Sequence, residues 1–426
     1  MDSIVLPSVE IGGEQQLLDS GCESPDSLHS QSSHPASEPT TVLSLDDSSS
    51  EAENDESDPN AELAAQLKGK KLSVPTSMLN VFKTVGWPIL DHRSSKWTDE
   101  FAARYERLKF DTHAILDLAL AESPDRLQKA KTHDFALFNI LWTPERVDYE
   151  GLWVASLLTT WLFIWDDFVD SNDGGLLAQD FNQACAWRRE AIVVAKQVLD
   201  LDDGHPAASL EVSGSMIVLA EFGRRAAKRL NRDQMQGIYR EIVLFIGAAE
   251  TEQAHRLAGY VPVDVDEYLD MRLLSSAVLA CFFSEEVFFE IALPDWVLYS
   301  DEMKVIFRDG NYLISIHNDI LSLKKEIVDN CIINMIPVLY FGGMPWEQII
   351  SHLQVELEAC CRRVDKAAEA LLEKTAGDAQ LSEAVESLVY SVRMNTTGNL
   401  GYLLASSRYS HLDNEKTEDG SLEIVL

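Results

Sequence analysis

The sequence predicts one large all-α domain that follows an acidic, disordered segment. After Leu72, long stretches repeat with the helical period, and alternations typical of strands are few. Pro262 and Pro294 fall between these stretches, where a residue without an N–H disturbs a helix least. No repeat of fixed length occurs in the chain. We therefore expect residues 73–412 to form a single helical domain.

Helical periodicity is clearest in seven stretches of this domain. Each is longer than a typical strand, and apolar residues recur in it every three or four positions. We predict helices at 149–169, 180–199, 232–257, 265–289, 303–326, 346–373 and 381–407.

The two ends of the chain differ in composition from its centre. Residues 1–72 are rich in Ser, Asp, Glu and Pro and contain few side chains that a fold could bury. Such a segment cannot offset the entropy lost on ordering, so we expect a disordered acidic tail. Residues 413–426 are polar, and we expect a frayed C-terminal tail.

Charge and hydropathy exclude several classes of partner. The formal net charge of -35 argues against nucleic acid and anionic membranes, which attract clustered Lys and Arg. The longest uncharged apolar run, 151–165, is shorter than the roughly 20 residues that span a bilayer, so we expect no stable membrane anchor. The N-terminus has neither a secretory nor a transit pattern, and no CxxC spacing occurs. These observations favour a cytoplasmic protein with reduced thiols.

A cluster of carboxylates follows the apolar part of the helix predicted at 149–169. Asp166 and Asp170 are four residues apart, with Asp167 beside the first, so two carboxylates project from one helix face. No Lys or Arg nearby in sequence neutralises them, and Mg²⁺ is the natural partner of such oxygens. The alternative is a solvent-exposed acidic turn, although acidic residues at a helix C-terminus oppose the macrodipole. Asp166 and Asp170 are therefore candidate metal ligands.

A second cluster of oxygen ligands lies in the helix predicted at 303–326. Asn318, Ser322 and Glu326 recur every four residues and form one column along the helix. An amide carbonyl, a hydroxyl and a carboxylate together suit Mg²⁺. An exposed polar stripe is the alternative, but the preceding segment is amphipathic and looks largely buried.

Together the two clusters resemble the paired metal motifs of class I terpene synthases, and the Lys-Glu ending of the second resembles fungal sesquiterpene cyclases in particular. The matching residues are Asp166-Asp167-x-x-Asp170 and Asn318-Asp319-x-x-Ser322-x-x-Lys325-Glu326. The resemblance covers roughly residues 74–411. It implies a helical bundle around a central apolar active-site cavity, ligands for three Mg²⁺ ions, and a substrate-binding role for Asn318 and Lys325.

Two arginines lie where this resemblance requires them. Arg272, 46 residues before Asn318, occupies a segment similar to the family's diphosphate sensor, and Arg408-Tyr409 is similar to its C-terminal Arg-Tyr pair. A guanidinium matches phosphate oxygens in a two-pronged fork. The resemblance thus implies substrate-binding and catalytic roles for Arg272, Arg408 and Tyr409, and a catalytic role for Asp166. Alone, each arginine would be read as a surface or ion-pair residue.

The segment around Arg272 departs from the family's pattern. Met271, Ser275 and Ser276 stand where many relatives have Arg, Thr and Gly, and the two serines fall at the positions of the helix break that is thought to help trigger ionisation. The departures thus fall at the positions linked to ionisation and not at the metal ligands. Aromatic candidates for stabilising a cation, for each of which core packing is the better interpretation, are Phe163, Phe282, Phe283 and Tyr312.

The resemblance implies an enzyme that ionises farnesyl diphosphate, releases diphosphate and cyclises the cation to a sesquiterpene hydrocarbon or alcohol. Two alternatives remain. A chain-elongating isoprenyl diphosphate transferase would be expected to have a second Asp-rich motif in place of Asn318, Ser322 and Glu326. A non-catalytic helical scaffold would not need the ligands of both clusters. The DxDD pattern at 200–203, which class II cyclases use, precedes Gly and Pro and is expected to be a loop.

Overall fold

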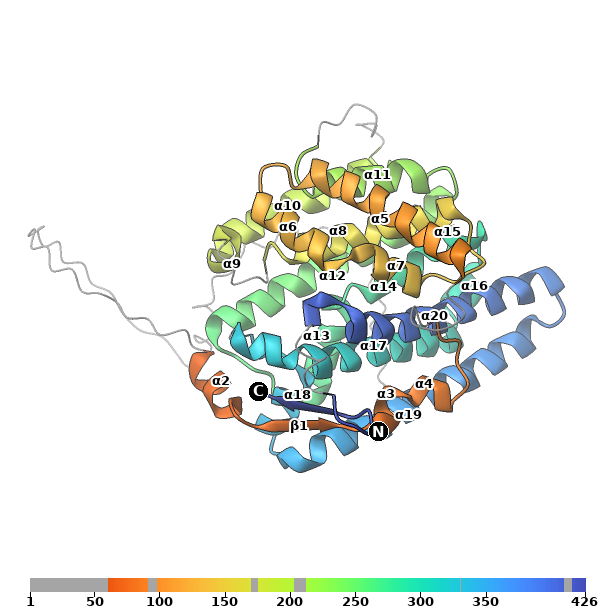
Figure 1. The fold of residues 1–426 in the computed structure, drawn as a ribbon. Helices are drawn as coiled ribbons and strands as arrows, with labels where there is room; N and C mark the ends of the chain where they lie inside the picture. The colour runs from red at the N-terminus through yellow and green to blue at the C-terminus, as the bar shows by residue number, and fades with distance from the viewer. Residues whose placement is uncertain (1–59, 91–97, 170–174, 203–211, 330, 410–415) are drawn as a thin grey trace, which may run out of the picture.

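The computed structural model describes residues 60–90, 98–169, 175–202, 212–329, 331–409 and 416–426. These residues form a predominantly helical bundle with one short two-stranded ribbon (Figure 1). In the first half of the chain the helices are α2 (Ala61–Leu67), α3 (Thr76–Leu79), α4 (Val81–Thr84), α5 (Asp99–Ala119), α6 (Pro124–His133), α7 (Phe135–Trp142), α8 (Tyr149–Asp166), α9 (Leu176–Gln179), α10 (Phe181–Val198) and α11 (Met216–Ala226).

The second half contains the longest helices, two of which pack along each other as α17 and α19. Its helices are α12 (Arg232–Ala258), α13 (Val265–Ser275), α14 (Val278–Ser284), α15 (Glu286–Phe289), α16 (Asp295–Leu298), α17 (Asp301–Val328), α18 (Met335–Phe341), α19 (Trp346–Thr375) and α20 (Ala379–Ala405). The predicted all-α class is confirmed. Every predicted helix except 265–289 matches an observed one to within three residues at each end.

Local sequence explains where several of these helices begin. The Asp148 carboxylate accepts a hydrogen bond from Gly151 N at 2.7 Å and caps α8. Asn231 and Gln234 form a capping box at the start of α12, each side chain bonding the other's backbone N–H. Both helices carry cavity-facing residues, so these caps fix elements on which the site depends.

The helices enclose a continuous apolar core, and α8 lies within it with nearly all of its side chains buried. Helix α20 packs closely against α7 at Gly398, where an added Cβ would lie 2.1 Å from the carbonyl oxygen of Leu141. Only a residue without a side chain allows this approach. The contact brings the end of α7 beside the central cavity.

The single helix predicted at 265–289 is wrong. The chain forms α13, α14 and α15 here, and the first break lies at Ala277, whose φ is 59°. A left-handed residue ends an α-helix, because it turns the following N–H away from the helical ladder. Alanine rarely adopts this conformation, so the sequence gives no sign of the break, and a prediction from periodicity extends the helix through it.

The ends of the chain contain more structure than the two expected tails. Within the segment assigned to the acidic tail, residues 60–72 include α2 and the start of β1 (Lys71–Val74); within the C-terminal segment, β2 (Leu422–Val425) pairs antiparallel with β1. Leu72, Val74, Leu422 and Ile424 are all buried. Figure 1 shows the ribbon beside α18 and α19. The cause is two short alternating stretches that bury one face only when paired.

The expectation that every thiol is reduced is wrong for Cys185, which is disulfide-bonded. Cys281, Cys331, Cys360 and Cys361 are free.

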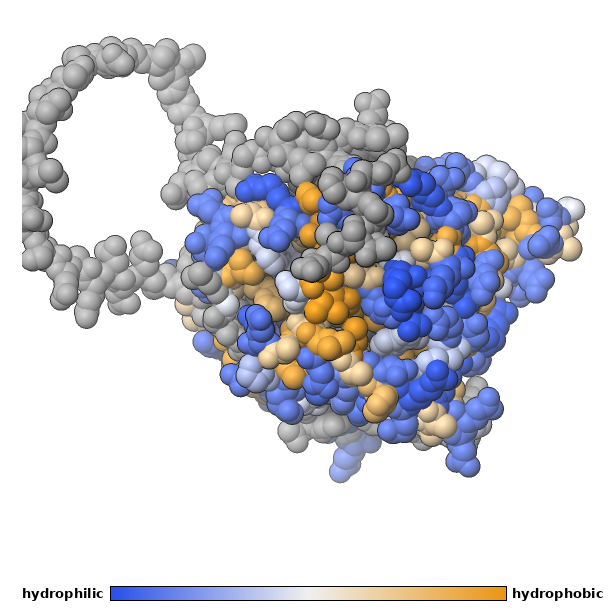
Figure 2. Space-filling model, turned by 90° about the horizontal axis from the view of Figure 1, so that it is seen from above, coloured by the Kyte–Doolittle hydropathy of each residue, from blue (hydrophilic) through white to orange (hydrophobic). Residues whose placement is uncertain are grey.

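None of the helices in the described ranges combines the length and apolar character needed to cross a bilayer. Among the coloured residues in Figure 2 most are hydrophilic, and a band of hydrophobic residues lies near the middle of this face.

Candidate active site

A cavity of about 230 Å³ lies in the centre of the bundle, lined by residues from α6, α7, α8, α12, α13, α14, α17 and α20 and from the segment after α20. It brings together every predicted site residue within the described part of the chain. These are Asp166, Arg272, Asn318, Ser322, Lys325, Glu326, Arg408 and Tyr409. Asp170, predicted as a metal ligand, lies outside the described residues.

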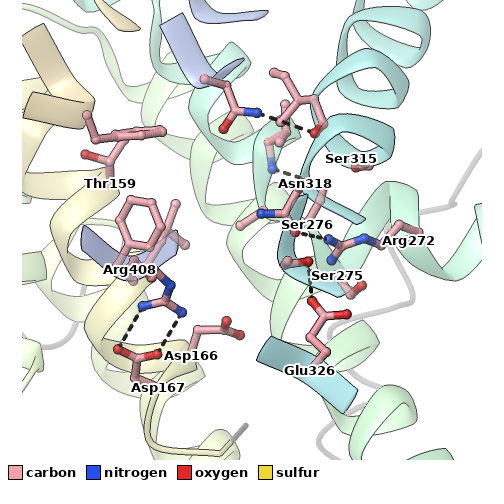
Figure 3. Close-up of a pocket in the computed structure, with 18 of the residues that line it drawn as sticks. Thr159, Asp166, Asp167, Arg272, Ser275, Ser276, Ser315, Asn318, Glu326 and Arg408 are labelled. Carbon is pink, nitrogen blue, oxygen red and sulfur yellow. Dashed lines mark hydrogen bonds and ion pairs between the residues drawn. The ribbon is translucent and has the colours of Figure 1, made fainter. Parts of the chain in front are cut away.

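One wall of the cavity is built where α8 ends, beside the segment after α20 (Figure 3). Arg408 donates through Nη2 to Asp167 Oδ1 at 3.1 Å and through Nη1 to Asp167 Oδ2 at 3.4 Å. The guanidinium outweighs the cost of burial and lowers the pKa of Asp167. Asp166 precedes this pair and lines the cavity. The wall therefore holds an acidic group and a guanidinium side by side.

His133, the last residue of α6, supports this wall from behind. Arg408 Nη1 lies 3.1 Å from His133 Nδ1, and because arginine only donates, this nitrogen is the acceptor of a neutral imidazole. Burial and the nearby Arg408 lower the pKa of His133 to about 4. The His133 carbonyl accepts from Tyr402 Oη at 2.6 Å. These bonds tie the Arg408 segment to α6 and α20.

The opposite wall consists of α13 and α17. Arg272 Nη2 donates to Asn318 Oδ1 and to Asp319 Oδ1, each at 3.0 Å. Tyr268, one turn before Arg272 on α13, donates its hydroxyl to Asp319 Oδ2. Burial opposes the charge of Arg272, but Asp319 is the main reason that its pKa lies well above the usual value. Asp319 thus anchors the guanidinium, while Asn318 faces the cavity.

Further along α17, the other two predicted ligands bond each other. Ser322 Oγ donates to Glu326 Oε1 at 2.6 Å, and Asn334 Nδ2 donates to Glu326 Oε2 at 2.8 Å. Burial and the charge of Asp319 raise the pKa of Glu326. A cation bound to this partly buried carboxylate would favour its charged form and so oppose that shift.

The donor set fits a hard divalent cation. Carboxylate, amide and hydroxyl oxygens line one cavity from two facing walls, and such oxygens are the ligands that Mg²⁺ and similar ions prefer. Within the described ranges, no three His, Cys, Asp or Glu side chains converge as a metal site by themselves. The second cluster accordingly depends on its amide and hydroxyl, which are bonded to Arg272 and Glu326 in this structure.

The rest of the cavity is apolar and aromatic. Of the four aromatic candidates, Phe163 lines it, whereas Phe282, Phe283 and Tyr312 are not among the lining residues. Phe163 meets Phe138 edge to face, with ring centroids 5.0 Å apart. Sequence spacing missed three further lining aromatics, Phe138, Trp142 and Phe245, because they come from helices that carry no motif.

Other residues missed from the sequence stand next to the motifs. Asp167 and Asp319 neighbour predicted ligands, and their adjacency was the available signal, but their arginine partners are distant in sequence. Lys129 and Glu252 also line the cavity. They lie on α6 and α12, and no pattern in those helices marks them.

Comparison with known proteins agrees with this geometry. Residues 158–363 match the family model described as terpene synthase family 2, C-terminal metal binding. The matched range contains Asp166, Arg272 and the whole second cluster.

Several characterised relatives align over most of the chain. The sesquiterpene cyclase hepA of Aspergillus oryzae is 28% identical over 314 residues, which cover 71% of this chain and 83% of the relative. The silphinene synthase peniA of Penicillium patulum is 26% identical over 72% of this chain and 80% of its own. A (+)-T-muurolol synthase of Roseiflexus castenholzii, described as cyclising (2E,6E)-farnesyl diphosphate, is 26% identical over 62% of this chain and 77% of its own.

Solved structures share the fold. Germacradien-4-ol synthase from Streptomyces citricolor superposes with a TM-score of 0.58 at 17% identity, covering 74% of this chain and 96% of that one. A hedycaryol synthase in complex with HEPES gives a TM-score of 0.57 at 20% identity, covering 74% and 95%. The helical bundle around the cavity is thus the architecture of terpene synthases.

Proposed function

We propose that this chain, a class I terpene synthase that resembles fungal sesquiterpene cyclases, converts farnesyl diphosphate to a cyclic sesquiterpene with Mg²⁺ as cofactor. The observation that carries the proposal is the pairing of two polar walls above an aromatic cavity. Relatives named as sesquiterpene cyclases, one of them described as acting on farnesyl diphosphate, support the C15 substrate.

The polar walls would bind the metal and the diphosphate. Asp166 on one side, and Asn318, Ser322 and Glu326 on the other, would hold Mg²⁺, for which we propose three ions, with Asp170 as a further ligand from the same sequence motif. When bound, Mg²⁺ supplies positive charge that stabilises the departing diphosphate. Asn318 Oδ1 accepts from Arg272 and Ser322 Oγ donates to Glu326 in this structure, and both oxygens keep lone pairs with which to bind a metal ion.

The cationic side chains would orient the leaving group. Arg272, once released by Asn318, could turn its fork toward phosphate oxygens, and Arg408, Lys325 and Tyr409 line the same cavity. Charge that develops on the diphosphate as the carbon–oxygen bond breaks would be met by these fixed donors.

The apolar part of the cavity would guide the carbon skeleton. Phe138, Trp142 and Phe163 present aromatic surfaces that stabilise positive charge and exclude water. Excluding water keeps the cation available to its own double bonds. Attack of a double bond on the cationic carbon would close a ring. Loss of a proton or capture of water would then give the product.

Product analysis tests the proposal. Purified protein is incubated with farnesyl diphosphate, with Mg²⁺ or with a chelator, and volatile products are identified by gas chromatography and mass spectrometry. We expect a cyclic C15 product that requires Mg²⁺ and disappears in Asp166→Ala and Asn318→Ala. Asp117→Ala, the same change at an exposed carboxylate on α5, should leave the product unchanged.

Two outcomes would overturn this assignment. If the C10, C15 and C20 diphosphates all remain unconverted, the cyclase proposal is wrong. If product forms only when isopentenyl diphosphate is added, and is a longer linear diphosphate, the chain-elongating alternative replaces it. The amide of Asn318 and the hydroxyl of Ser322 favour a cyclase over a chain-elongating transferase.

A further inference from the structure

The break between α13 and α14 opens onto the cavity. Helix α13 ends at Ser275, Ala277 adopts a left-handed conformation, and α14 begins at Val278. Ser275, Ser276 and Ala277 all line the cavity. Carbonyl groups in the last turn of a helix lack intrahelical donors and carry partial negative charge. The position of this turn therefore decides where negative charge faces a substrate.

Asn311, on α17, holds this turn in place. Its side chain is fully buried. Nδ2 donates to the Leu273 carbonyl at 2.8 Å, and Oδ1 accepts from Ser276 Oγ at 3.0 Å. Oδ1 also accepts from Ser315 Oγ at 3.0 Å, so both acceptor positions of the amide oxygen are used. One side chain thus satisfies an orphan carbonyl of α13 and fixes the residue at the break.

The Asn311 contact differs from the Arg272 contacts, which also join α13 to α17. Arg272 joins α13 to α17 through Asn318 and Asp319, and these bonds change if its guanidinium turns toward the diphosphate. Asn311 lies about two turns before Asn318, and none of its partners belongs to the proposed metal ligands. Its bonds can persist while the Arg272–Asn318 bond breaks.

We propose that Asn311 is a positioning residue for cyclisation: it keeps the end of α13 fixed against α17 while Arg272 turns toward the diphosphate. The inference rests on the proposed cyclase function and concerns the step after ionisation. With the turn held, its carbonyls meet the cation in one orientation. With the turn loose, the cation takes up water and loses a proton, which gives an acyclic alcohol.

The readout is the ratio of acyclic C15 alcohol to cyclic product, because this ratio does not depend on how much of the enzyme is folded. We expect Asn311→Ala to raise it about fivefold, the factor that corresponds to one hydrogen bond of about 1 kcal/mol. The rate of diphosphate release should change by a smaller factor than this ratio, because the residues of the two polar walls remain. Asn311→Asp keeps the acceptor for both hydroxyls, loses the donor to Leu273, and should shift the ratio in the same direction.

Val364→Ala is the control for a purely structural effect. Val364 is fully buried on α19, outside the cavity lining, so the variant loses core packing without touching α13. Its product ratio should equal that of the wild type. Ser276→Ala combined with Asn311→Ala should shift the ratio less than the sum of the single effects, because the two side chains share a bond.

Two results would overturn the inference. One is an unchanged ratio in Asn311→Asp or Asn311→Ala; the other is an equal shift in Val364→Ala. Failure of the cyclase proposal would look different, because the wild type itself would then form no cyclic product from farnesyl diphosphate. Where Asn311→Ala does not fold, Asn311→Asp and Ser276→Ala decide the question, since each removes part of the hydrogen bonding around the break and keeps the rest of the Asn311 side chain in place.

Discussion

At the residue scale, the site depends on side-chain pairs between helices that are far apart in sequence. The motif residues were predictable, because oxygen ligands at helical spacing project from one face. Their partners were not predictable, since Arg408 and Asp167, or Arg272 and Asp319, meet only through the tertiary fold. From the sequence we predicted that Arg408 binds the substrate. The structure adds that Arg408 bonds the carboxylate of Asp167, the neighbour of Asp166.

The Arg408–Asp167 pair makes a prediction about stability. Asp167→Ala leaves a half-buried guanidinium without its carboxylate and should lower the free energy of unfolding by about 1–3 kcal/mol. Lys131→Gln, which removes an ion pair to the exposed Asp117, should change it by less than about 1 kcal/mol. Chemical denaturation of both variants measures the difference. Equal losses would mean that the cavity pair is no more than a surface contact.

The neutral His133 makes a prediction about pH. Its pKa in the folded protein is about 4, below the value of 6.5 of an exposed imidazole, so the unfolded chain binds more protons between these values. Stability should therefore fall as the pH drops from 6.5 toward 4. His133→Asn keeps an acceptor for Arg408 but does not titrate, and it should flatten this part of the curve. Thermal melts across the range provide the test, and an unchanged slope would assign the effect to other groups, such as His317.

At the element scale, periodicity located the long helices but not their interruptions or the short strands. Helices α17 and α19 were predictable because their apolar faces repeat over many turns. The break at Ala277 carries no Gly or Pro, and each strand of the ribbon has only four residues. Such features are stabilised by tertiary contacts, among them Asn311, rather than by local propensity.

The crossing of α7 and α20 makes a prediction at this scale. Gly398→Ala would place a Cβ 2.1 Å from a backbone oxygen, and because backbone cannot rotate away, the two helices must separate. We expect a loss of about 2 kcal/mol or more in unfolding free energy. Gly377→Ala is the matched control, since nothing lies within 4 Å of its added Cβ. Denaturation curves that move equally for the two variants would contradict the close approach.

The terminal ribbon makes another prediction. Ile424→Thr places a hydroxyl on the buried face of β2, whereas Glu423→Thr introduces the same residue on the other face. The first should raise hydrogen-exchange rates of the Lys71–Val74 amides and cost about 1–3 kcal/mol; the second should leave both nearly unchanged. Equal exchange in both variants would contradict the register of the ribbon.

At the scale of the whole molecule, a chain of net charge -35 binds an anion only where cations are concentrated. Lys129, Arg272, Lys325 and Arg408 line the same cavity, beside carboxylates that would hold metal. The sequence predicted the polar end of this cavity and the family's fold. It did not predict the apolar contour, because Phe138, Trp142 and Phe245 come from helices without motifs.

The central claim is that the two walls act as one site for metal and diphosphate. Isothermal titration calorimetry with inorganic diphosphate tests it most directly. The account predicts binding in Mg²⁺ that disappears with chelator, and affinity at least about tenfold weaker in both Asp166→Ala and Asn318→Ala, with Lys131→Gln unchanged. The account would be contradicted if diphosphate bound without metal, or if only one of the two substitutions, Asp166→Ala or Asn318→Ala, weakened binding.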